Sequence, residues 1–249
     1  MITVNSSSSK NPKINASVSE FISAIGYCEY QIPFYLQGVK PPPSVNIQKG
    51  TKAHKQEEIY EKEHYEFKPI TTQELQDVTK EIEFQREVLH TRLQFSFSIG
   101  GTNPTISLAG RCDKIFREDN SLIILDDKFP ANPSQYMQLT RPYTSQLLQL
   151  LVYLNSSFTT TNSFDPNDWF EIPHETKRWI LQIRDRKNNN EPCKIFQGVQ
   201  DSKTESFLFE NIQRFGCLVL NMEKYKHHNS IHRCNACSFK DMCKHRVQE

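Results

Sequence analysis

The spacing of apolar residues predicts which parts of the chain form helices and which form strands. Helical spacing covers residues 17–36, 50–63, 142–154 and 201–227, and the alternation typical of strands covers 93–99, 176–186 and 193–196. The helix predicted at 142–154 is apolar on nearly all sides, so we expect it to be buried, packed against a sheet.

Residues 108–129, LAGRCDKIFREDNSLIILDDKF, have the pattern of a β-hairpin. Strands are expected at 110–116 and 122–129, with residues 105–108 leading into them. Together with the strand at 93–99 they form a three-strand antiparallel meander. A two-residue turn would place Asp113 directly opposite Asp126, with Lys128 projecting on the same face as Asp126. Two carboxylates this close repel each other unless a cation lies between them. The hairpin therefore predicts a metal site.

Two further groups are candidates for the same site. Gly50, His54 and Glu58 follow at intervals of four along one face of a charged helix. That arrangement suits a metal ligand with a supporting group, although a solvated helix with a surface histidine is the commoner case. Gln149 and Tyr153 share a face of the buried helix, where they could satisfy local hydrogen bonds or reach a substrate.

Composition limits the possible function classes. The 249 residues include 30 Lys and Arg against 29 Asp and Glu, so the net charge of +1 gives no overall attraction to nucleic acid. No signal peptide or membrane span is evident, and we expect a soluble, cytoplasmic protein, or a nuclear or mitochondrial one in a eukaryote. Residues 1–16, rich in Ser and Asn, are expected to be a disordered leader before a single domain over 17–249.

Three cysteines lie in the basic segment 224–249 at the spacing of metal ligands: Cys234, Cys237 and Cys243. Three thiolates are one short of a tetrahedral set. The fourth ligand could be local, His232 or His245, as in a zinc knuckle, or distant, with Cys28 as the candidate. Three other cysteines receive no role: Cys112, Cys193 and Cys217.

The order of these motifs resembles a known family. A Cys near the start is followed by Gly-x3-His-x3-Glu, Gly-x2-Asp, Asp-x-Lys, Gln-x3-Tyr and Cys-x2-Cys-x5-Cys. This order resembles the iron–sulfur RecB-like nucleases of the PD-(D/E)xK superfamily, such as the CRISPR-associated RecB-like exonucleases and the exonuclease V family. The resemblance covers about residues 20–245. It implies an α/β fold, with a mixed central sheet flanked by helices and a small helical iron–sulfur lobe formed by residues 17–45 and 224–249.

The resemblance also implies roles for individual residues. The ligands of Mg²⁺ or Mn²⁺ would be His54, Asp113, Asp126 and the carbonyl of residue 127. Lys128 would orient or activate the attacking water, and Gln149 and Tyr153 would position the lysine or the DNA. A [4Fe–4S] cluster would be held by Cys28, Cys234, Cys237 and Cys243. The sequence departs from many relatives at Asp126, where they have Glu, and at Phe129, where they have a small hydroxyl residue.

The implied activity is a metal-dependent exonuclease that degrades single-stranded DNA from the 5′ end, in repair or in CRISPR spacer processing. Aromatic residues that could stack on its bases are Tyr136, Tyr143 and Trp169. The alternatives are a non-catalytic DNA-binding protein with a structural cluster or zinc, and a structure-specific endonuclease. DNA-processing proteins are possible partners, no membrane is expected, and the oligomeric state is left open.

Overall fold

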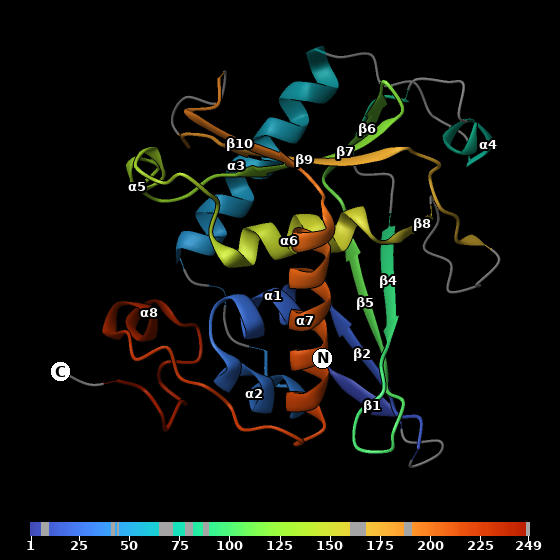
Figure 1. Cartoon of the computed structure of the whole chain (residues 1–249). Helices are drawn as coiled ribbons and strands as arrows, with labels where there is room; N and C mark the ends of the chain where they lie inside the picture. Colours follow the sequence, from blue (N-terminus) through green and yellow to red (C-terminus); the bar gives the residue numbers. More distant parts are fainter. Residues whose placement is uncertain are drawn as a thin grey trace.

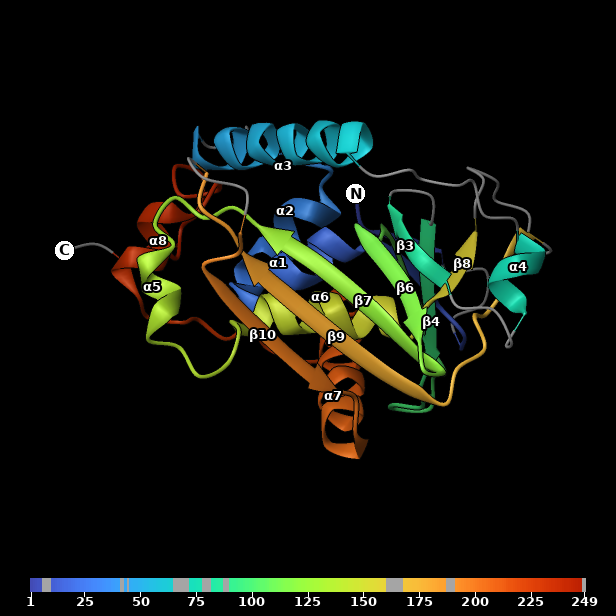
Figure 2. The ribbon, with the colours of Figure 1, turned by 90° about the horizontal axis from the view of Figure 1, so that it is seen from above.

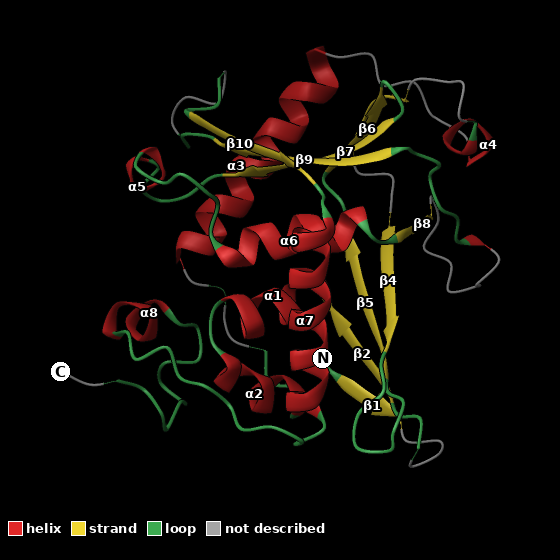
Figure 3. Ribbon diagram, viewed as in Figure 1, coloured by secondary structure: helices red, strands yellow, loops and turns green. Residues whose placement is uncertain are grey.

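The strands form two five-stranded sheets with helices between and around them (Figures 1 and 3). The computed structural model describes residues 1–5, 10–40, 43, 45–64, 72–77, 82–86, 90–159, 168–186 and 191–247. The first sheet has the order β1-β2-β5-β4-β8 and the second β10-β9-β7-β6-β3. The pairs β2/β5 and β7/β9 are parallel and the other neighbours are antiparallel, so both sheets are mixed.

The strands are β1 (Thr3–Asn5), β2 (Lys13–Ser17), β3 (Ile82–Arg86), β4 (His90–Ser96), β5 (Thr105–Arg111), β6 (Lys114–Glu118), β7 (Ser121–Lys128), β8 (Ser157–Thr159), β9 (Thr176–Ile183) and β10 (Lys194–Val199). The helices are α1 (Val18–Gly26), α2 (Ile32–Leu36), α3 (Val45–His64), α4 (Thr72–Gln76), α5 (Ser134–Met137), α6 (Thr144–Leu154), α7 (Ser202–Val219) and α8 (Ile231–Ala236), with a 3₁₀ turn, η1, at Glu29–Gln31.

The expectation of one continuous strand at 110–116 within a single central sheet was wrong. β5 ends at Arg111, the chain bends at Cys112 and Asp113, and β6 begins at Lys114 in the other sheet. The meander is therefore divided between two sheets. The bend places Asp113 where the two sheets meet, beside β7.

The predicted register of the hairpin is confirmed. β6 and β7 pair from Glu118↔Ser121 to Lys114↔Leu125. Asp119 and Asn120 have φ angles of 47° and 56°. Two left-handed residues make the turn whose twist matches that of the strands, and Asp and Asn tolerate this conformation better than most side chains.

The disordered leader expected over residues 1–16 is also contradicted. β1 and β2 extend the first sheet, and Lys13–Ser17 pairs in parallel with Thr105–Ala109. Ile14 is fully buried. The folded part of the chain therefore begins before residue 17, whose side chain caps α1 by accepting from the Glu20 N–H. Residues 6–9 lie outside the described part of the chain.

The core lies where α6 passes between the two sheets, as Figure 1 shows. Leu148, Leu150 and Leu151 of this helix are fully buried, as its all-round apolar pattern predicts. Figure 2 shows α3 alongside the second sheet as a long separate helix. α7 ends at Val219, earlier than the expected 227. No described helix combines the length and apolar character that crossing a membrane requires.

Candidate active site

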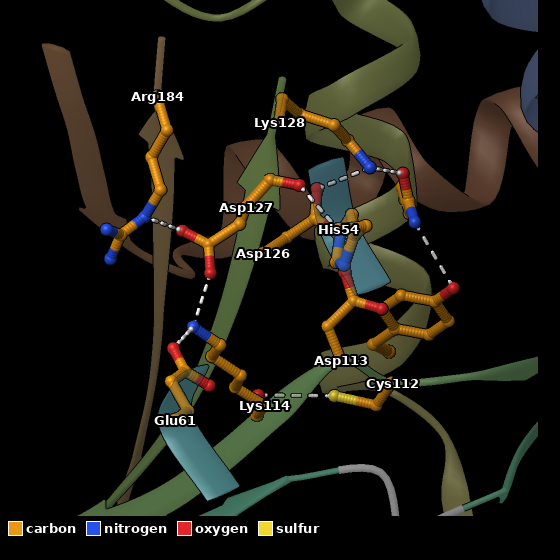
Figure 4. Close-up of polar contacts among 11 residues, drawn as sticks. His54, Glu61, Cys112, Asp113, Lys114, Asp126, Asp127, Lys128 and Arg184 are labelled. Carbon is orange, nitrogen blue, oxygen red and sulfur yellow. Dashed lines mark hydrogen bonds and ion pairs between the residues drawn. The ribbon is translucent and has the colours of Figure 1, made fainter. Parts of the chain in front are cut away.

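Three predicted metal ligands from distant parts of the sequence lie together at one end of β7. His54 Nε2 on α3 lies 3.3 Å from Asp113 Oδ2 and 3.1 Å from the carbonyl oxygen of Asp127. Asp126 projects from β7 toward the same place (Figure 4). The bend after β5 supplies one ligand, the strand supplies the second, and the helix supplies the third.

The two carboxyl groups have different environments. Burial raises the pKa of Asp126 to about 8, with Lys128 opposing the shift and Asp113 adding to it. Burial also acts to raise the pKa of Asp113, but hydrogen bonds with His54 and Asp126 and the charge of Lys128 lower it. Without a cation, the two carboxyl groups therefore retain one shared proton at neutral pH, and burial favours the neutral form of Asp126.

Lys128 is held by a chain of hydrogen bonds. Its Nζ lies 2.7 Å from Asp126 Oδ2 and donates to Gln149 Oε1 at 3.0 Å, and Gln149 Nε2 donates to Tyr153 OH at 3.3 Å. Burial acts against the charged amine, but the nearby Asp126 and Asp113 raise the pKa of Lys128. Tyr153 is only 5% exposed, so its hydroxyl contacts Gln149, the partner of Lys128, and not solvent.

This set of donors fits a hard divalent cation. Asp126 Oδ1 is buried and accepts no hydrogen bond, which is costly for a carboxylate unless a cation is bound. Two carboxylates and a carbonyl suit Mg²⁺, and the imidazole of His54 also suits Mn²⁺. Burial acts to lower the pKa of His54, but Asp113 raises it, so a cation would compete with a proton for this ring.

Behind these ligands is a buried ionic network that the sequence did not reveal. Asp127 is fully buried and turns away from Asp126 toward Lys114 and Arg184 (Figure 4). It pairs with Lys114 Nζ, and Arg184 Nε donates to it at 2.8 Å. The network continues to α3, where Glu61 lies 2.5 Å from Lys114 and Glu57 lies 3.2 Å from Arg184. Ion pairs thus dock the helix that carries His54.

Two expectations about these charges change. Glu58 was taken as the companion of His54, whereas Glu57 and Glu61 are the buried acids that face the sheet. Their spacing of three and seven residues from His54 was the available signal. An arginine of the predicted strand 176–186 would be expected to be solvated at a sheet edge or to contact a phosphate. Arg184 is instead buried, because β9 lies inside the sheet, between β7 and β10.

The N- and C-terminal segments meet in a small lobe that contains α2 and α8. Tyr27 OH donates to the Arg233 carbonyl at 2.5 Å, and the rings of Phe34 and Phe239 stack 4.7 Å apart. Burial raises the pKa of the Cys28 thiol to about 11, and the nearby C-terminal cysteines add to the shift. The four predicted cluster ligands are thus neighbours, and every cysteine of the chain has a free thiol.

Two histidines also lie at this lobe. The ligand atoms of Cys28, His227 and His228 lie within 4.8 Å of one another. However, His227 Nδ1 accepts from the Asn229 N–H and His228 Nδ1 from the Ser230 N–H, each at 3.0 Å. A neutral ring then carries its proton on Nε2 and donates toward sulfur, as His227 does toward Cys234 at 3.8 Å. Of the predicted local ligands, His232 is exposed, and His245 packs against Tyr30 with ring centroids 4.0 Å apart.

One solved structure supports the fold, and a second is less similar. The crystal structure of SSO0001 matches with a TM-score of 0.50 and 13% sequence identity, covering 94% of this chain and 88% of that one. An alkaline exonuclease from Laribacter hongkongensis matches with a TM-score of 0.42 and 13% identity, covering 84% of this chain and 89% of its own.

Sequence comparison identifies the family. No curated protein matches the chain. The family model of the PD-(D/E)XK nuclease superfamily matches residues 37–244, which include the acidic site and the three C-terminal cysteines. Because this match covers most of the sequence, the chain belongs to the PD-(D/E)XK nuclease superfamily.

Proposed function

We propose that this protein is a Mg²⁺- or Mn²⁺-dependent deoxyribonuclease that degrades single-stranded DNA from the 5′ end. The observation that carries the nuclease proposal is the unsatisfied, buried Asp126 oxygen beside Asp113, His54 and Lys128. The exonuclease mode, the preference for single strands, the 5′ polarity and a place in repair or CRISPR spacer processing rest on the motif resemblance.

Each residue of the site would have a separate role in the reaction. Asp113, Asp126, His54 and the Asp127 carbonyl would hold the cation, which when bound lowers the pKa of water and offsets phosphate charge. Lys128, with its raised pKa, stays protonated at neutral pH and would orient the attacking water and face the phosphate as a cation. Gln149 fixes the direction of the Lys128 amine, and Tyr153 fixes Gln149.

The direct test compares wild-type protein with Lys128→Ala on end-labelled single-stranded DNA in Mn²⁺. We expect the variant to cleave at least about 10²-fold more slowly, the usual loss when a positioned charge is removed from an active site. Lys203→Ala, an exposed lysine on α7, is the matched control. Labels at either end report polarity, and circular single strands distinguish an endonuclease. Equal rates for wild type and Lys128→Ala would leave a DNA-binding protein as the better description.

Metal affinity should depend on pH. A cation at Asp126 must displace the proton that this group holds below its pKa of about 8. We therefore expect the Mn²⁺ affinity to rise by up to about tenfold per pH unit from pH 6 to 8, and then to level off. Calorimetry in buffers of different ionisation enthalpy would measure the proton released. An affinity that is constant over this range would contradict the shared proton.

We also propose that Cys28, Cys234, Cys237 and Cys243 hold a [4Fe–4S] cluster. One zinc ion would draw its thiolates to within about 3.8 Å of one another, given a Zn–S bond of about 2.3 Å. Among the described residues, the C-terminal cysteines belong to no group of three ligands within 4.8 Å. Their wider separation favours the larger cluster.

Removing the distant ligand tests this proposal. We expect anaerobically purified wild-type protein to contain iron and acid-labile sulfide, and Cys28→Ser to lose most of both, because a cluster with three ligands is labile. Cys193→Ser, at an exposed cysteine, is the control and should keep its iron. Zinc without iron in the wild-type protein would instead support a zinc-binding lobe.

A further inference from the structure

A cavity of about 410 Å³ lies between the nuclease core and the cysteine-bearing lobe. Its walls come from α1, α2, the start of α3, the start of α6 and the segment that follows α8. Figure 1 shows α2 and α8 near each other at the lower left, with the beginning of α6 above them. Segments from both ends of the sequence therefore contribute to one site.

The cavity is close to the acidic site along α6. Ser145 lines the cavity, and Gln149, which holds Lys128, follows it by four residues on the same helix. One helical turn advances about 5.4 Å, so the two side chains are neighbours on one face. Gly26 packs directly against Ser145. A Cβ at position 26 would lie only 2.6 Å from the Cα of Ser145, so a larger residue would not fit there. α1 can therefore approach α6 closely at this point.

The lining suits a flat, uncharged ring. Three aromatic side chains line the cavity, together with three aliphatic ones, four neutral polar ones and one thiol: Tyr27, Tyr35, Phe239, Ile22, Ile47, Ala236, Ser23, Gln31, Ser145, Ser238 and Cys237. No charged side chain lines it among the described residues, so a phosphate would find no counter-charge there. Tyr35 OH donates to Gln31 Oε1 at 2.9 Å, and Gln31 Nε2 donates toward Cys237 Sγ at 3.7 Å. These bonds fix the polar wall before any ligand binds.

We propose that this cavity binds one unpaired nucleobase of the strand whose phosphate lies at the acidic site. The inference rests on the proposed nuclease function and gives its single-strand preference a physical cause, because a base paired in a duplex cannot enter. It also gives the lobe a function, since Ser238 lies in the wall of the base-binding cavity. Of the aromatics first expected to stack on bases, Trp169 is covered by Arg92 at 4.1 Å, and Tyr136 is buried.

The test places a larger side chain at the edge of the cavity, where it would occupy the space proposed for the base. Ile47 is 52% exposed, so Ile47→Trp can add a ring without disturbing the core. We expect its affinity for oligothymidylate, measured by fluorescence anisotropy in Ca²⁺, to fall at least fivefold, because base–aromatic contacts account for much of the binding of single strands. Ile59→Trp, also on α3 and 55% exposed, is the control for adding a tryptophan. This control, which does not line the cavity, should cleave thymidine 5′-(p-nitrophenyl phosphate), a small diester, within twofold of wild type.

The outcomes separate the two proposals. If Ile47→Trp binds oligothymidylate as tightly as wild type and Ile59→Trp, the cavity does not bind a base. If wild-type protein cleaves neither DNA nor the small diester, the nuclease proposal fails, and the anisotropy measurement still decides about the cavity. A scan with one abasic residue adds a second readout. Wild-type binding should weaken when the abasic residue occupies one particular position, and Ile47→Trp should lose that dependence.

Discussion

Asp126→Asn is expected to abolish cleavage and to leave the metal-free fold at least as stable as the wild type. The amide keeps the size of the side chain but cannot serve as an anionic ligand, and metal assistance contributes several kcal/mol to such reactions. Each 1.36 kcal/mol is a factor of ten, so the loss in rate should be at least about 10³-fold.

The stability of this variant follows from the raised pKa of Asp126. The carboxyl is ionised at pH 7 in the unfolded chain but protonated in the fold, where its pKa is about 8. Folding must therefore take up a proton, and this cost grows as the pH rises from about 4 to 8. Asparagine removes the cost, about 4 kcal/mol at pH 7, since about three pH units at 1.36 kcal/mol each separate the ordinary pKa of an aspartate from pH 7. Urea unfolding in EDTA at pH 5 and pH 7.5 would measure it. A variant less stable than wild type at both pH values would contradict the explanation.

Asp127→Asn, the same change one residue later, should have the opposite effect on stability. Its carboxylate lies between Lys114 and Arg184, both nearly fully buried. Neutralising it leaves two buried cations short of negative charge, and breaking a buried pair typically costs about 3–5 kcal/mol. We expect the free energy of unfolding to fall by about 3 kcal/mol, measured by urea unfolding at pH 7.

A second variant tests whether this loss of stability comes from the broken ion pairs or from a general sensitivity of strand β7 to substitution. Lys114→Met combined with Asp127→Leu and Glu61→Gln removes one cation together with the two acids that it contacts, and leaves Arg184 paired with Glu57. It should recover part of the lost stability, because replacing a buried ion pair with apolar residues is often close to neutral. A stability of Asp127→Asn within 1 kcal/mol of wild type would show that the network contributes little.

The sequence was sufficient for features set by local chemistry. The Asp119–Asn120 pair favours one tight turn, and that turn fixes which residues of the hairpin face each other. Helical spacing then placed Gln149 and Tyr153 on one face, where they are joined by a hydrogen bond. Each of these predictions depended on residues within a few positions of one another.

Features that depend on distant partners could not be predicted in this way. The bend at Cys112 and Asp113 has no turn signal in the sequence, because it arises where two sheets take up successive strands. The sequence of residues 13–17 resembles a polar leader, because its role as a strand depends on pairing with the distant β5. Glu57 and Arg184 read as solvated charges for the same reason, since each is buried only when the other approaches.

The parallel pairing of β2 with β5 has a consequence for how the protein folds. Residues 13–17 acquire their partner only at residues 105–109, so about ninety residues must be synthesised before the first sheet can close. We expect the N-terminal segment to remain without its sheet during early synthesis, and the lobe to form last, when residues 231–243 join α1 and α2. A ribosome-bound chain ending near residue 100 should therefore be cleaved readily by proteases at residues 13–17, and a chain long enough for residues 105–109 to have left the ribosomal tunnel should resist.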